Sequence, residues 1–128
     1  MAIPRTSTSF KRVISWILQV LLALLFAVQG VVKLMGSPGW VARFNRWGYP
    51  HYFYLVVGAA ELAGAVLLFI PKLAKFGVLL LAVVMIGATG THLLHHEPQV
   101  VTTLVLLALL GTLFYLRFRV RRGRVAAE

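Results

Sequence analysis

The chain of 128 residues has no cysteine, and it has three acidic residues against thirteen lysines and arginines. The lack of cysteine excludes disulfide exchange, thiolate catalysis and cysteine-ligated metal sites. The shortage of acidic residues gives a net charge of +10, which in a soluble protein would suggest nucleic-acid binding. Here the basic residues lie between and beside long apolar runs. Contact with lipid head groups explains them better, and we expect no nucleic-acid partner.

Apolar residues are what the chain has in excess: they make up 60% of it, and the mean hydropathy is +0.88. A soluble domain is roughly 45–50% apolar. Several runs reach the roughly 20 residues that a helix needs to cross a bilayer. They are continuously apolar and do not alternate with a period of two, so they predict helices and not the strands of a barrel. We therefore expect an all-α transmembrane protein.

Four apolar segments predict four membrane-spanning helices, at about residues 13–35, 53–70, 74–94 and 99–116. The first is longer than the apolar region of a signal peptide, which has about 7–15 residues, so we expect it to be retained. Short turns make consecutive helices antiparallel neighbours, which predicts one four-helix bundle over residues 13–116. Residues 1–12 then form a basic N-terminus, and residues 117–128 form an arginine-rich tail.

A short amphipathic helix is predicted between the first two spans. The stretch GSPG at residues 36–39 ends the first span, because proline lacks a donor and glycine loosens the backbone. In the segment that follows, Trp40, Phe44 and Trp47 recur at the spacing of one helical face. Aromatic rings on one face and arginines beside them are typical of a helix that lies in the head-group layer.

The basic residues also predict the orientation of the chain. Four spans place both termini on one side, together with Lys72 and Lys75 and all the arginines of the tail. The opposite side has Arg43 and Arg46. Because loops rich in lysine and arginine stay in the cytoplasm, we expect both termini there and the turns at 36–52 and 95–98 outside.

Glu61 lies within the second predicted span, among glycines, alanines and apolar residues. It is about nine residues from the outer end of that helix and so about 13 Å deep, where an unpaired ionised carboxylate costs several kcal/mol. The small residues around it allow close helix packing, so we expect its side chain to face protein and not lipid. Two roles stay open: a ligand- or proton-binding group, and a hydrogen-bonded link between helices.

Lys33 lies near the outer end of the first predicted span. Its long side chain can turn inward to Glu61 or outward to the head groups. Gln29 lies four residues earlier on the same face of the helix, and Gln19 and Ser15 extend this less apolar face toward the other end. We expect this face to line the bundle interior, and we take Lys33, Gln29 and Glu61 as candidate ligand-binding residues.

His92 lies near the outer end of the third predicted span, four residues before His96. Two histidines at this spacing can bind a metal with Glu97 as a third ligand, but nothing in the sequence supplies a fourth. We therefore assign no metal site and no catalytic residue. We expect His92 instead to join Glu61 and Lys33 in a polar cluster in the outer half of the bundle, as a further candidate ligand-binding residue.

Four stretches in this order resemble the landmarks of the DoxX-like family of small membrane proteins. They are QGVVKL at the end of the first span, WGYP before the second, GAAELAGAVLLFIP within the second and MIGATGTHLLHHEP at the end of the third. Each alone is weakly specific, because most of its residues are Gly, Ala and Leu. Together they cover about residues 10–115.

The resemblance implies a four-helix protein of the bacterial inner membrane. The family takes its name from a subunit associated with a terminal quinol oxidase and with thiosulfate–quinone chemistry in acid-loving archaea. Its charged positions correspond to Lys33 and Glu61 in this sequence. The lack of cysteine sets this chain apart from related four-helix proteins that perform thiol chemistry.

Two functions fit these observations. In the first, the bundle binds a small lipophilic molecule, a quinone or a lipid, or serves as a redox accessory protein, and the polar cluster supplies the few polar contacts of such a site. In the second, the chain is a structural or assembly subunit of a larger membrane complex. An enzyme or a transporter fits less well, because the sequence has no cofactor motif, no nucleophile–base pair and no metal box. Quinone is the one cofactor that we consider. The sequence leaves open whether the chain forms homo-oligomers.

Overall fold

The computed structural model describes residues 2–119, with side chains over residues 9–118, and this part of the chain is all helical. Five α-helices follow one another: α1 (Ala2–Leu34), α2 (Pro38–Arg46), α3 (Phe53–Phe69), α4 (Ala74–Leu94) and α5 (Val100–Phe114). A π-helical turn, Tyr115–Arg119, continues α5. The rest of the predicted tail, residues 120–128, lies outside the described residues.

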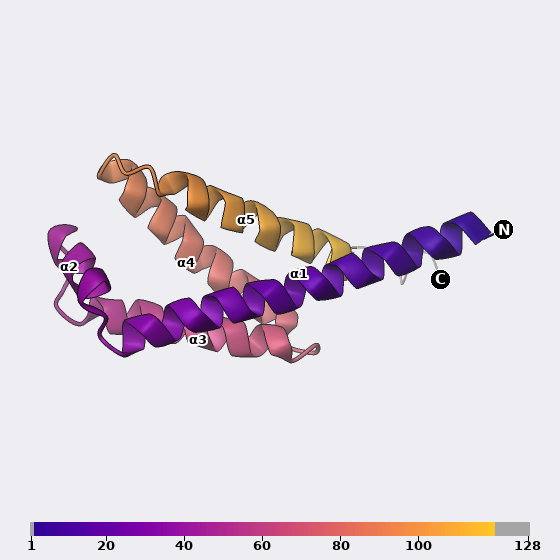
Figure 1. Ribbon diagram of the computed structural model, residues 1–128, viewed down its shortest axis with the longest axis horizontal. Helices are drawn as coiled ribbons and strands as arrows, with labels where there is room; N and C mark the ends of the chain where they lie inside the picture. The colour runs from indigo at the N-terminus through magenta and orange to yellow at the C-terminus, as the bar shows by residue number, and fades with distance from the viewer. Residues whose placement is uncertain (1, 120–128) are drawn as a thin grey trace.

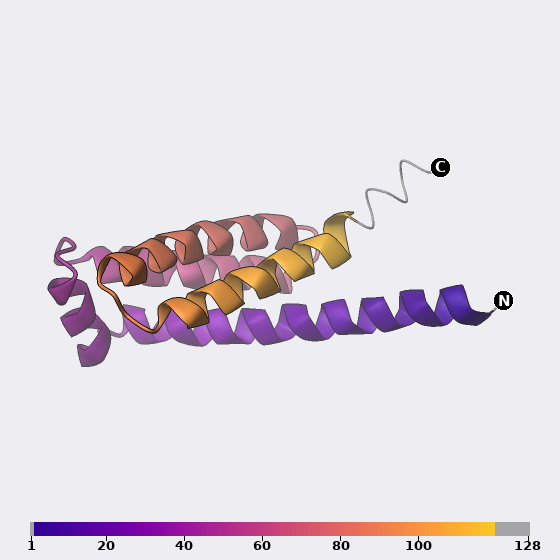
Figure 2. The ribbon, with the colours of Figure 1, turned by 90° about the horizontal axis from the view of Figure 1, so that it is seen from above.

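The helices run back and forth along one long axis (Figure 1). α1 and α4 run toward the end of the molecule where α2 lies, and α3 and α5 return from it (Figures 1 and 2). Each long helix packs against the next long helix in the chain: α1 with α3, α3 with α4 and α4 with α5. α1 also contacts α5. The predicted all-α antiparallel architecture, with a short helix between the first two long ones, is confirmed.

The lengths of the helices differ in part from the prediction. Residues 9–34 of α1, all of α4 and residues 100–118 are long and apolar enough to cross a membrane, whereas α3 is a shorter apolar helix of 17 residues. α1 is also longer than its apolar part, because the helix continues through the basic N-terminal residues to Ala2. At 1.5 Å per residue it is about 50 Å long, and it extends past the other helices (Figure 2).

Three helices end in the same way, with a residue of positive φ just after the last turn. Gly36 (φ 71°) follows α1, Gly48 (φ 83°) follows α2 and His96 (φ 54°) follows α4. In each case the amide of this residue and the amide of the next one donate to carbonyls of the last turn, for example Glu97 N to His92 O at 2.9 Å. This is the Schellman pattern, which closes a helix and reverses the chain. Glycine adopts this conformation freely, so histidine at position 96 is the unusual case.

Small residues set the distances between the long helices. A Cβ on Gly30 would lie 2.7 Å from the carbonyl oxygen of Gly58, so α1 and α3 approach backbone to backbone at this point. A Cβ on Gly77 of α4 would likewise lie 2.8 Å from the carbonyl oxygen of Gly64 on α3. Membrane helices associate through such close packing, because lipid gives them no hydrophobic drive.

The interior between the helices is mostly apolar, with large side chains such as Phe26, Leu68 and Leu81 fully buried. Many large apolar side chains face outward on all four long helices, as expected for a surface in contact with lipid. Against this background the buried polar side chains stand out, and they are Ser15, Gln19, Lys33, Glu61, Thr91, His92 and Thr103.

Candidate functional site

Lys33 of α1 and Glu61 of α3 form a buried ion pair. Lys33 Nζ lies 2.7 Å from Glu61 Oε1, and the two side chains are 5% and 3% exposed. The pair lies beside the point where Gly30 and Gly58 bring the two helices together, since a Cβ on Gly58 would meet the Cβ of Lys33 at 2.8 Å. The close backbone approach therefore allows a lysine on one helix to reach a carboxylate on the next.

The ammonium of Lys33 and the carboxylate of Glu61 do not use all their hydrogen-bonding groups on each other. Although the Nζ–Oε1 distance is short, Oε1 receives no well-aligned hydrogen bond within the described residues. An ammonium has three donors and a carboxylate accepts about four hydrogen bonds. The pair therefore has donors and acceptors that its mutual contact does not use.

Trp40 of α2 covers the lysine. Lys33 Nζ lies 3.9 Å from the centre of a Trp40 ring, and Arg43 Cζ lies 4.9 Å from it. Both distances are in the range of cation–π contacts. One aromatic ring thus contacts two cations, of which Lys33 also contacts Glu61.

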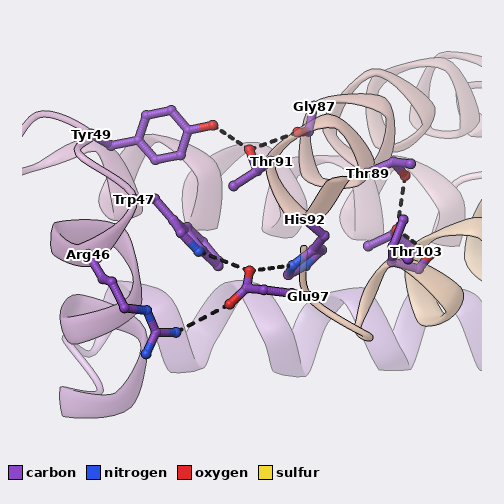
Figure 3. A network of polar contacts seen from close by, with 10 residues as sticks. Arg46, Trp47, Tyr49, Gly87, Thr89, Thr91, His92, Glu97 and Thr103 are labelled. Atoms are coloured by element: carbon purple, nitrogen blue, oxygen red, sulfur yellow. Dashed lines mark hydrogen bonds and ion pairs between the residues drawn. The ribbon is translucent and has the colours of Figure 1, made fainter. Parts of the chain in front are cut away.

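A second polar cluster lies where α2 meets the turn between α4 and α5, and its centre is Glu97 (Figure 3). Oε1 of Glu97 accepts a hydrogen bond from Trp47 Nε1 at 3.0 Å and lies 2.9 Å from His92 Nδ1. Oε2 accepts a hydrogen bond from Arg46 at 3.3 Å. One carboxylate therefore connects α2 to α4, and we call these four residues the Glu97 cluster.

Ionisation of Glu97 fixes the roles of its partners. The hydrogen bond with His92 lowers the pKa of Glu97 most; partial desolvation opposes it, and the Trp47 hydrogen bond and the charges of His92 and Arg46 add to the lowering. Glu97 is thus a carboxylate at neutral pH and can only accept hydrogen bonds. His92 must then donate from Nδ1, and its other ring nitrogen, Nε2, takes no part in this contact.

Further polar contacts surround the Glu97 cluster (Figure 3). The hydroxyl of Tyr49, just after α2, bonds the hydroxyl of Thr91 on α4, which in turn donates to the carbonyl oxygen of Gly87 at 2.9 Å. Thr89 of α4 donates to Thr103 of α5 at 2.9 Å. These contacts tie α4 to its neighbours at the same end of the molecule.

The family model of the DoxX-like family matches residues 17–113, which span α1 through most of α5. The chain belongs to the DoxX-like family. A Bacillus subtilis (strain 168) protein named "Putative oxidoreductase CatD" is 33% identical to it over 75 residues, or 59% of this chain. The match covers 56% of that relative, so the chain spans little more than half of its length. No solved structure matches the chain.

The structure brings two of the candidate residues of this DoxX-like chain into contact and gives His92 another partner. Lys33 turns inward to Glu61, which is one of the two directions that the sequence left open. His92 was expected to join them, but its polar partner is Glu97, because the turn after α4 brings that carboxylate back over the last turn of its own helix. Gln29 is half-buried, and its side chain makes no hydrogen bond within the described part of the chain.

Sequence reasoning missed three parts of the site: Trp40 as the cover of Lys33, Glu97 as the centre of a cluster, and Trp47 as its partner. One signal was available for Glu97. It is one of three acidic residues, and its turn lies at the same end of the predicted bundle as Arg46. The contact of Trp40 with Lys33 had no comparable signal, because the aromatic residues of this segment were equally well explained by the membrane interface.

Gln19 is a buried polar residue of a different kind, at the other end of the α1–α3 contact. Its Nε2 donates to the carbonyl oxygen of Leu68 at 2.6 Å. That carbonyl lies in the last turn of α3, where its helical donor would be the amide of residue 72, beyond the end of the helix. Gln19 therefore caps a helix end, which is a structural role and makes it a useful control.

Proposed function

We propose that this DoxX-like protein binds a small lipophilic molecule with a polar head, a quinone or a lipid, at the Lys33–Glu61 pair. In the quinone case it would serve as a redox accessory protein. We further propose that the protein lies in the inner membrane of a bacterium, with both termini in the cytoplasm and α2 on the outer side.

The observation that carries the proposal is a salt bridge buried between α1 and α3, in a mostly apolar interior. A buried ion pair is a weak source of stability, because desolvation of two charges offsets most of their attraction. Ionisable residues inside membrane segments are rare and usually belong to ligand, ion or proton pathways. A function that needs the two charges is therefore a better explanation than stability alone.

The residues fit a quinone-like head by their chemistry. Lys33 can donate to a carbonyl oxygen while Glu61 holds it in place, and Glu61 can hold a proton. Trp40 offers an aromatic face beside the ammonium. Gln29 lies one helical turn from Lys33 and has an amide to donate. Bound quinone would supply the two-electron redox chemistry, and the name of the Bacillus subtilis relative is compatible with such a role.

Native mass spectrometry of the protein extracted gently from bacterial membranes tests the proposal. We expect the parent protein to retain a quinone or lipid, and the double variant Lys33→Met/Glu61→Leu to lose it while keeping its fold, since paired apolar replacements are often tolerated. Gln19→Leu is the matched control, because it removes a buried polar group from the same helix pair and should leave the ligand bound. Equal retention by the folded double variant would refute the proposal.

A structural or assembly subunit is the second candidate, and the contact of Gly30 with Gly58 beside the ion pair favours it. In this case Lys33 and Glu61 only fix the register of two closely packed helices. The same extraction would then recover a protein neighbour and no small molecule. Glu61→Gln would leave that association intact, since a glutamine at this position can still accept a hydrogen bond from Lys33.

A further inference from the structure

α2 is attached to the rest of the protein through its buried Phe44 and through side chains at its two ends. Near its start, Trp40 lies on Lys33 of α1. At its end, Arg46 and Trp47 bind the carboxylate of Glu97. Between them Phe44 packs against Phe53 at a centroid distance of 6.1 Å. The polar contacts of Arg46 and Trp47 with the α4 side of the molecule therefore converge on one carboxylate, and Tyr49, just after α2, adds a hydrogen bond to Thr91 of α4.

Glu97 is itself held in place from the other side. The Schellman turn after α4 returns the chain, so that the amide of Glu97 bonds to His92 O at 2.9 Å. Its carboxylate meets the ring of the same histidine at Nδ1. Glu97 is thus fixed to α4 by both backbone and side chain. The oxygens of its carboxylate also accept hydrogen bonds from Arg46 and Trp47 at the end of α2 (Figure 3).

A rigid helix connects this attachment to the Lys33–Glu61 pair. Trp40 and Trp47 are seven residues apart, which is two turns or about 10 Å, and they lie on one face of α2. Phe44 lies between them on that face and contacts both rings, at centroid distances of 6.3 Å and 5.2 Å. Any displacement of the Trp47 end would therefore move Trp40 relative to Lys33.

We infer that Glu97 is a positioning residue for the site at Lys33 and Glu61: by holding the end of α2 to α4, it keeps Trp40 over the lysine and so shapes the ligand site. The inference rests on the proposed function for its ligand. Its geometric part, the dependence of the place of α2 on Glu97, can be measured without any ligand.

Electron–electron distance measurement between two spin labels tests the geometric part, and the lack of native cysteine makes the labelling clean. Gly39→Cys carries one label on α2, where no atom lies within 4 Å of a Cβ, and the exposed Val83→Cys carries the other on α4. In lipid nanodiscs we expect one narrow distance distribution for the parent. Glu97→Ala should broaden or shift it, and Glu97→Gln should do so less, because the amide can still accept from Trp47.

Thr89→Val is the matched control, since it removes the hydrogen bond between α4 and α5 at the same end without touching α2. It should lower stability but leave the distance distribution unchanged. Binding of decylubiquinone to the same samples provides the functional readout. We expect Glu97→Ala to weaken it by about fivefold or more, the lower end of typical coupling between linked sites, and Thr89→Val to leave it unchanged.

The outcomes separate this inference from the proposed function. A distribution that Glu97→Ala and Glu97→Gln leave unchanged would overturn the positioning role, whatever the protein binds. A distribution that changes as expected, in a protein whose parent form binds no quinone or lipid, would keep the role of Glu97 in placing Trp40 and would refute the proposed ligand site.

Discussion

Lys33 and Glu61 contact each other inside the membrane part of the chain, so each removes most of the cost of burying the other. Removal of one partner leaves a single buried charge, which typically destabilises a protein by about 3–5 kcal/mol. Replacement of both by apolar residues of similar size is often neutral or stabilising.

We therefore predict a strongly non-additive double-mutant cycle. Lys33→Met and Glu61→Leu should each lower the free energy of unfolding by several kcal/mol, and the double variant should recover most of the loss. Unfolding in mixed detergent micelles, followed by circular dichroism, measures all four proteins. Additive losses would mean that the two charges do not depend on each other.

Glu97 gives a pH dependence at the residue scale. Its pKa in the folded protein is below the ordinary value of 4.5, chiefly because of the hydrogen bond with His92. A carboxyl group with a lowered pKa stabilises the fold above its ordinary pKa, and this contribution is lost as the pH falls through the lowered value. The charged and titratable groups that face it are Arg46 of α2 and His92 of α4.

We predict that thermal stability falls as the pH drops below about 4.5, and that the fall is smaller in Glu97→Gln, which cannot ionise. Thermal unfolding in nanodiscs between neutral pH and about pH 3 measures the difference between the two proteins. Parallel curves for parent and variant would show that Glu97 does not contribute to the pH dependence.

At the scale of helices, close backbone contact decides the packing of α1 on α3. A methyl group on Gly30 would be 2.7 Å from two backbone atoms, Gly58 O and Leu62 N, which cannot move aside as a side chain can. Gly90 of α4 differs, since nothing lies within 4 Å of a Cβ there.

We predict that Gly30→Ala destabilises the protein by about 1–3 kcal/mol, the usual cost of overpacking. Gly90→Ala should be neutral or stabilise it by about 0.5–1 kcal/mol, because alanine is the better helix former. Unfolding in mixed micelles compares the two alanine variants directly. A Gly30→Ala protein as stable as the parent would contradict the close contact of α1 and α3.

For the whole molecule, the distribution of basic residues predicts its orientation in the membrane. Lys75 lies in the first turn of α4, which starts at the end of the helices opposite to α2 (Figure 1), and His51 lies between α2 and α3. Because cytoplasmic loops carry the excess of lysine and arginine, the Lys75 end should be cytoplasmic.

We predict that a membrane-impermeant maleimide labels His51→Cys in intact bacterial spheroplasts and labels Lys75→Cys after permeabilisation. Both positions are exposed, and the chain has no cysteine of its own to react. Labelling of Lys75→Cys before permeabilisation would reverse the proposed orientation.

Local sequence signals predicted the helices well, and the polar contacts less well. The predicted spans at 53–70 and 74–94 match α3 and α4 almost to the residue. Pro71 follows the end of α3, and the turn at residues 95–98 follows the end of α4. The predicted start of α1, at about residue 13, was about three helical turns too late, since hydropathy indicates where the apolar part ends and not where the helix ends. The turn at residues 95–98 was predicted, but the positive φ of His96, which returns Glu97 to His92, was not, because no glycine marks that position.

The sequence by itself determined the helical class, the ends of the middle helices and the membership in the DoxX-like family, because each depends on the local order of apolar, glycine and proline residues. It also placed Lys33 near the outer end of the first long helix and Glu61 within the next one. Tertiary structure alone decided that Glu97 takes His92 and Trp47 as partners and that Trp40 covers Lys33. These choices depend on how α2 crosses the end of the bundle, and the energies that fix that crossing come from side chains far apart in the chain.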